Sequence, residues 1–147
     1  MPMRRPSHLT QWAAQFAVAS ELCKRGYQVA LTHGNHPSVD MMVRSPQGAE
    51  FDVDVKGLYK KNFFLLAPKK DRKGLIYILT YVPEGEANQF FVLSQTDANN
   101  EIQQDIERAR ARQLAKGGGG EKAGVMPGIS WQAAQRYKDQ WEQTLPA

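Results

Sequence analysis

Two aspartates and a lysine, on two segments with the alternating pattern of β-strands, have the residue types and spacing for metal-assisted chemistry. Asp40 belongs to the segment 39–43, and Asp54 and Lys56 belong to the segment 51–56. Because side chains alternate between the two faces of a strand, Asp54 and Lys56 share one face, expected to be wet, and apolar residues take the other. If the two segments pair as a hairpin, the three charged groups converge.

Carboxylates from two strands, with a lysine beside them, suit the hydrolysis of a phosphodiester. A hard divalent cation such as Mg²⁺ binds one or two carboxylates together with waters and phosphate oxygens. A neighbouring ammonium group can hold a nucleophilic water or neutralise charge that develops on the phosphate. An Asp-x-Lys triplet on a strand is also a common cross-strand salt bridge, so that interpretation stays open.

These segments resemble the active-site core of the PD-(D/E)xK nuclease superfamily, whose members share the restriction-endonuclease-like fold. Residues 38–40 (Ser-Val-Asp) stand where the family has its first Asp, and residues 54–56 (Asp-Val-Lys) form its (D/E)xK motif. The predicted helix upstream, with residues 13–19, resembles the first helix of small stand-alone members. In such members this helix often carries a Glu that helps to bind the metal, and Gln15 stands at that position here.

The resemblance implies a metal-dependent endonuclease that hydrolyses DNA phosphodiester bonds with Mg²⁺ or Mn²⁺. Asp40 and Asp54 would hold the metal, aided by the backbone carbonyl of Val55. Lys56 would position the attacking water or stabilise the phosphate, and Gln15 would orient a metal-bound water. A homodimer is a further expectation, because many small nucleases of this fold pair two active sites.

Gln15 departs from the family pattern because an amide supplies no negative charge. A second hypothesis is therefore a catalytically silent nuclease fold that serves as a DNA-binding or protein-interaction module. Glu21 is the nearest acidic residue, but it lies roughly 600° round the helix from Gln15 and thus on another face. A third hypothesis is an unrelated small α/β domain in which Asp54 and Lys56 form only a salt bridge.

The order of elements predicts one α/β domain over residues 7–145, preceded by a flexible arm over residues 1–6. Its expected architecture is a restriction-endonuclease-like three-layer core, with a mixed central sheet of about five strands flanked by helices. Ser7 is the predicted N-cap of the first helix and Gly26 the residue that ends it. Helical spacing predicts that the buried stripe of this helix comprises Leu9, Trp12, Ala13, Phe16, Ala17 and Ser20, widened by Ala14, Val18 and Leu22.

Later segments complete the expected core. The apolar runs 75–82 and 89–93 are predicted to be central strands covered on both faces. A second helix begins at residues 94–97, and Ser130 caps a last helix over residues 131–144 whose tryptophans dock onto the core. On the second helix, Ile102, Ile106, Ala109 and Gln113 are expected to be buried, and Glu101, Glu107, Arg108, Arg110 and Arg112 to face water.

A lysine-rich segment with interleaved aromatic residues follows the charged strand. It suggests a loop that tracks nucleic acid, in which lysines neutralise phosphates and aromatic rings stack on bases. The candidate nucleic-acid-binding residues are Lys60, Lys61, Lys69, Lys70 and Arg72. The alternative is that residues 63–66 form a short core strand and the basic side chains are ordinary solvated surface.

Composition narrows the class of protein further. The chain of 147 residues is 41% hydrophobic with a net charge of +4, which permits but does not demonstrate a polyanionic partner. Cys23 is the only cysteine, so no internal disulfide forms. The absence of a long apolar run or signal peptide favours a cytoplasmic protein without a membrane partner.

Two weaker candidates stand beside the central motif. His33 and His36 could bind zinc with Asp40, although a structural zinc site wants four ligands. Asp52, on the charged face, is interpreted as an exposed strand residue, with a supporting or direct role at the metal as the alternative.

Overall fold

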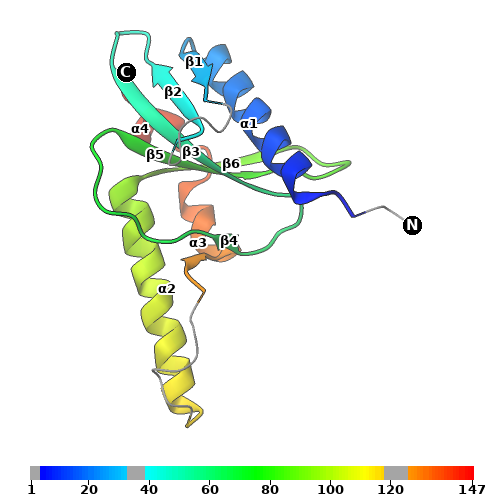
Figure 1. Ribbon diagram of the computed structural model, residues 1–147, viewed down its shortest axis with the longest axis vertical. Coiled ribbons are helices and arrows are strands. Elements are labelled where there is room, and N and C mark those ends of the chain that lie inside the picture. Colours follow the sequence, from blue (N-terminus) through cyan, green and yellow to red (C-terminus); the bar gives the residue numbers. More distant parts are fainter. Residues whose placement is uncertain (1–3, 33–38, 118–125) are drawn as a thin grey trace.

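The computed structural model describes residues 4–32, 39–117 and 126–147, and it shows an α/β chain (Figure 1). The elements in chain order are α1 (Ser7–Lys24), β1 (Gln28–Leu31), β2 (Met41–Arg44), β3 (Glu50–Leu58), β4 (Phe64–Leu65), β5 (Leu75–Tyr81), β6 (Gln89–Ser94), α2 (Gln95–Ala115), β7 (Gly128–Ile129), α3 (Trp131–Ala134), η1 (Gln135–Tyr137) and α4 (Trp141–Thr144). Among these described helices, none combines the length and the apolar character needed to cross a membrane.

A mixed five-stranded sheet forms the centre, with strand order β1-β2-β3-β5-β6. Strands β1, β2 and β3 are successively antiparallel, β3 and β5 are parallel, and β5 and β6 are antiparallel. Parallel neighbours require a crossover connection, and residues 59–74 provide it here. This crossover segment contains β4, which pairs with β7 in a separate two-stranded sheet, and it contains no α-helix.

Helices cover both faces of the sheet, in agreement with the burial of every residue of β5. Val53 and Val55 pack in one cluster with the buried face of α1, and Trp141 of α4 belongs to the same cluster. Tyr77 and Phe91 pack on the other face with buried residues of α2 and α3. Figure 1 shows α1 and α2 on opposite sides of the sheet. The expected layers of helix, sheet and helix are therefore present.

Strand β5 is central and fully buried, as predicted, whereas β6 lies at the edge of the sheet. The outer side of β6 is covered by the chain near the C-terminus, where Lys138 forms a bridge with Phe91 and the Asp139 backbone N–H donates to Phe90 O at 2.9 Å. This pairing explains why the predicted single C-terminal helix is wrong. The chain turns extended at Lys138 to meet β6, so α3 with η1 is separated from α4.

Only part of the predicted stripe of α1 enters the core. Leu9 and Phe16 are 49% and 57% exposed, while Ala14, Val18 and Leu22 are fully buried. The reason is a close approach of α1 to β3, which only small side chains at the contact permit.

The N-cap prediction for α1 is wrong, because Pro6 occupies that position and Ser7 is the first helical residue. Gly26 follows the helix with a φ of 90°.

Helix α2 begins as predicted, since the Ser94 hydroxyl accepts from the Asp97 backbone N–H at 3.1 Å. Glu101 was expected to face water but is 4% exposed. Its carboxylate accepts from the Tyr137 hydroxyl at 2.9 Å and lies 2.7 Å from the Arg136 guanidinium. This charge can be buried because Arg136 and Tyr137 pair with it. Both partners come from the C-terminal segment, so the spacing of residues along α2 does not reveal them.

Candidate functional site

The carboxylate of Asp40 lies at the point where β2 and β3 separate. The last pair of the two strands is Met41 with Val53, and the Asp40 backbone N–H still donates to Val53 O at 3.0 Å. Its Oδ2 accepts from the Val55 backbone N–H at 2.7 Å. The carboxylate thus takes the place of the backbone carbonyl that a longer β2 would offer to Val55. This bond fixes the carboxylate beside the middle of β3.

Gln15 reaches the same carboxylate from α1. Its Nε2 donates to Asp40 Oδ1 at 3.3 Å, and the residue is 8% exposed. Glu21, the substitute considered for this role, pairs instead with Lys24 at 3.6 Å. The structure therefore brings Gln15, and not Glu21, to the predicted site.

Asp54 is paired with two lysines. Lys56 Nζ lies 3.2 Å from Asp54 Oδ1, and Lys69 Nζ lies 2.8 Å from Oδ2. The predicted wet face is in fact covered here, because Asp54 is only 3% exposed while both lysine side chains remain about a third exposed. Burial and the charge of Asp54 raise the pKa of the neighbouring Tyr77 to about 12.

The two carboxylates are close enough to affect each other. Burial raises the pKa of Asp40 above its usual value of 3.8, and the charge of Asp54 raises it further. The Val55 backbone N–H and the charge of Lys56 act in the opposite direction. A site with two neighbouring carboxylates, one of which resists ionisation, favours a bound cation or a bound proton.

Asp40→Asn is therefore expected to stabilise the fold at neutral pH. The pKa of Asp40 is higher in the folded chain than the usual value of 3.8, so the protonated carboxyl favours the folded state. This contribution to the free energy of unfolding is lost as the pH rises from 3.8 through the folded-state pKa. The amide mimics the protonated state: its oxygen can still accept from Val55, and its nitrogen can donate to Asp54 once the Gln15 amide turns its oxygen toward this nitrogen in place of its own NH₂ group. The urea midpoint should rise at about pH 7 and change little at about pH 3. A lower midpoint at neutral pH would contradict this account of Asp40.

Gln11 is a residue of the site that the sequence analysis missed. Its Nε2 donates to Val55 O at 2.7 Å, and its Oε1 accepts from the Gly57 backbone N–H at 3.2 Å. Gln11 thus forms hydrogen bonds with the backbone groups of β3 that lie beyond the end of β2. One of them is the carbonyl of Val55, which the resemblance assigns to the metal. The pattern that could have revealed it is its i, i+4 spacing from Gln15, which places both amides on one helical face.

The crossover segment is attached to the start of α2 by side-chain amides. Gln95 accepts from the Arg72 backbone N–H at 2.7 Å and donates to Lys70 O at 3.0 Å. Asn99 donates to Lys69 O at 3.0 Å. These bonds hold Lys69 in position beside Asp54, a role that sequence reasoning did not assign to either amide.

Two of the five candidate nucleic-acid-binding residues therefore pair with carboxylates of β3. Lys69 pairs with Asp54, and Arg72 Nη2 lies 2.6 Å from Asp52 Oδ2, so Asp52 is half-buried and paired. The other three side chains are exposed: Lys60, Lys61 and Lys70. The alternative of a short core strand is confirmed in part, because Phe64 and Leu66 are buried in the core. Binding of nucleic acid by the exposed lysines stays a prediction.

The residues present fit a hard divalent cation. Asp54 Oδ1 is buried and makes no hydrogen bond to the described residues, although Lys56 lies within ion-pair distance. No group of three or more His, Cys, Asp or Glu forms a metal site within the described ranges. Two carboxylates nevertheless suffice for Mg²⁺, which keeps several waters and takes phosphate oxygens. The zinc candidates His33 and His36, and Ser38, lie outside the described residues.

No protein-family model, curated protein or solved structure matches this chain. The functional assignment therefore rests on the geometry of the site.

Proposed function

We propose that this protein is a Mg²⁺- or Mn²⁺-dependent nuclease of the PD-(D/E)xK type that hydrolyses DNA phosphodiester bonds. The observation that supports the proposal is the convergence of Asp40, Asp54 and Lys56 where β2 and β3 separate. A buried Asp54 with one oxygen free of hydrogen bonds to the described residues, a half-buried Asp40 beside it and an adjacent ammonium group suit cation binding and phosphate chemistry.

Each residue has a role that follows from its contacts. Asp40 and Asp54 would hold the cation, which polarises the phosphate and the attacking water. The Val55 backbone N–H and Gln15 keep the Asp40 carboxylate in place. Lys56, about a third exposed, can reach the solvent side of Asp54 and stabilise negative charge as water attacks phosphorus and the bond to the leaving oxygen breaks.

A silent nuclease fold that only binds is the second candidate, and two contacts favour it. Gln15 supplies an amide to Asp40 where the family often has an acid, and Lys69 neutralises Asp54 without a metal. In that case the protein binds DNA or another protein, but no metal-dependent cleavage occurs.

A cleavage assay separates the two candidates. Supercoiled, linear, branched and single-stranded DNA would be incubated with Mg²⁺, Mn²⁺ or EDTA. The parent chain is expected to cut at least one of these only with metal, and Lys56→Ala to cut it about 10²-fold more slowly. Lys24→Ala is the matched control, because Lys24 is an exposed lysine at the end of α1 and pairs with Glu21 rather than with Asp54. Binding without cutting on every substrate would support the silent fold instead.

A further inference from the structure

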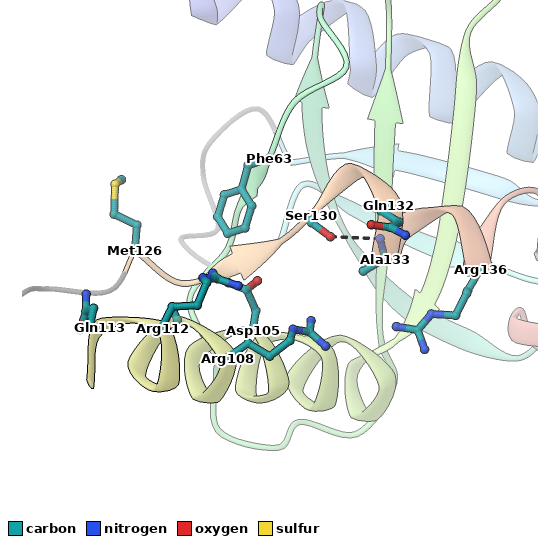
Figure 2. Close-up of a pocket in the computed structure, with 11 residues that line it drawn as sticks. Phe63, Asp105, Arg108, Arg112, Gln113, Met126, Ser130, Gln132, Ala133 and Arg136 are labelled. Atoms are coloured by element: carbon teal, nitrogen blue, oxygen red, sulfur yellow. Dashed lines mark hydrogen bonds between the residues drawn. The ribbon is translucent and has the colours of Figure 1, made fainter. Parts of the chain in front are cut away.

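A second candidate site lies away from the carboxylates, in a groove of about 960 Å³ between α2 and the segment 126–136. Figure 2 shows that α2 forms one wall and that the chain around β7 and α3 forms the other, with Phe63 at the rim. The groove is lined by both polar and apolar side chains. Its position beside the crossover segment places it next to the chain that carries Lys69 to Asp54.

Arginines dominate the charge of the groove. Arg108 and Arg112 lie one turn apart on α2 and Arg136 comes from the opposite wall, while Asp105 is the single acidic residue of the lining. Three positive charges against one negative charge give a net charge of +2. Arg108 and Arg112 are exposed, as predicted, and their i, i+4 spacing puts them on one face of α2.

The two arginines of α2 are available to a ligand. Arg136 is held by Glu101 at 2.7 Å, but within the described parts of the chain neither Arg108 nor Arg112 forms an ion pair. A guanidinium group presents five N–H donors in a planar fork that matches two phosphate oxygens. An anionic oxygen is therefore the ligand chemistry that this pair fits.

An aromatic ring and amide groups accompany the arginines. Phe63 is half-buried, and its ring rests on the backbone of Gly128, where an added Cβ would overlap it. Gln113 and Gln132 also line the groove, and Met126 is 65% exposed. Guanidinium groups with a partly exposed ring and amides are typical of sites for single-stranded nucleic acid, in which the backbone is neutralised and unpaired bases stack.

The walls of the groove are fixed relative to each other. Glu101 of α2 binds both Arg136 and Tyr137 on the opposite side of the groove. Within that side, the Ser130 hydroxyl caps α3 by accepting from the Ala133 backbone N–H at 3.0 Å (Figure 2). A site with fixed walls loses little conformational freedom on binding.

We infer that this groove binds a single-stranded segment of nucleic acid, with Arg108 and Arg112 on phosphates and Phe63 stacked on a base. The inference rests on the proposed nuclease function and deepens it, because it names the form of the substrate that the chain holds outside the cutting site. An acidic peptide would satisfy the arginines but would leave the half-buried Phe63 ring without a base to stack on.

The test is the binding of a fluorescently labelled oligothymidylate, measured by anisotropy in EDTA. The logarithm of the association constant for a single strand falls linearly with the logarithm of the salt concentration. Each lost phosphate contact makes this slope less steep by about 0.7, which corresponds to an association constant about fivefold lower at 0.1 M salt. Arg108→Gln and Arg112→Gln are each expected to weaken binding about fivefold, and the double variant about 25-fold. Arg110→Gln is the matched control, since Arg110 lies on the same helix but outside the groove.

Changes to the ligand test the rest of the inference without altering the protein. An abasic strand of equal length should bind more weakly than oligothymidylate, and a duplex of equal length should also bind more weakly. Equal effects of all three arginine variants, equal binding of the abasic strand, or equal competition by polyglutamate would overturn the inference.

The two proposals fail separately. A parent chain that binds as described but never cuts would refute only the nuclease. A parent chain that cuts with metal but binds single strands independently of Arg108 and Arg112 would refute only the groove.

Discussion

Asp54→Asn is expected to slow metal-dependent cleavage of DNA by about 10³-fold or more, because a neutral amide cannot replace the buried carboxylate as a cation ligand. The substitution keeps the shape of the side chain. Lys56 and Lys69, each about a third exposed, can turn to solvent when their partner loses its charge. The fold should therefore survive, and the loss should appear in single-turnover cleavage rates.

Asp52→Asn is the matched control for this variant. Asp52 lies on the same face of β3 two residues earlier, and its carboxylate pairs with Arg72 rather than with the lysines of the site. Its cleavage rate should stay within about threefold of the parent. Equal losses in the two variants would indicate a general effect of charge on the strand and would contradict a specific role of Asp54.

Gly57→Ala is expected to lower the free energy of unfolding by about 1–3 kcal/mol through overpacking. A Cβ at this position would lie 2.7 Å from the Cβ of Ala14 and 3.1 Å from the carbonyl oxygen of Thr10. Helix α1 cannot simply move away, because Gln11 and Gln15 bind β3 and Asp40. Urea unfolding measures the loss.

The double variant Ala14→Gly with Gly57→Ala tests the cause of that loss. Glycine in a helix costs about 1 kcal/mol by itself, so independent effects would make the double variant worse than either single variant. Relief of the overlap should instead make the double variant more stable than the sum of the two changes predicts. Simple additivity would show that the contact between the two residues is not the cause.

The sequence was sufficient to locate the strands, although not to place β6 at the edge of the sheet, because alternation along a strand is a local property. Val53 and Val55 enter the core as their spacing predicts, and Asp40 reaches β3 as a hairpin requires. The buried face of α1 was not predictable in the same way. Apolar residues such as Leu9 and Phe16 marked a stripe, but the close contact of Ala14 with Gly57 turns a different face inward.

The candidate site shows the same division. Asp40, Asp54 and Lys56 were recognisable because the motif lies within one strand and its partner. Lys69 was not recognisable as a partner of Asp54, since its position depends on Gln95 and Asn99, which lie about 30 residues further along the chain and hold the crossover segment.

The C-terminal segment was mispredicted for a similar reason. Its helical spacing is real, but hydrogen bonding of Asp139 to β6 breaks the helix in two. Tertiary contacts of this kind override local propensity and leave no periodic pattern in the sequence.

Calorimetric titration of Mn²⁺ into the parent chain and into Asp40→Asn, both without DNA, tests the central claim most directly. The account predicts that the parent binds one cation at the carboxylate pair and that Asp40→Asn, which retains its fold, does not. Binding of equal strength in both proteins, or no binding in the parent, would contradict a metal site formed by Asp40 and Asp54.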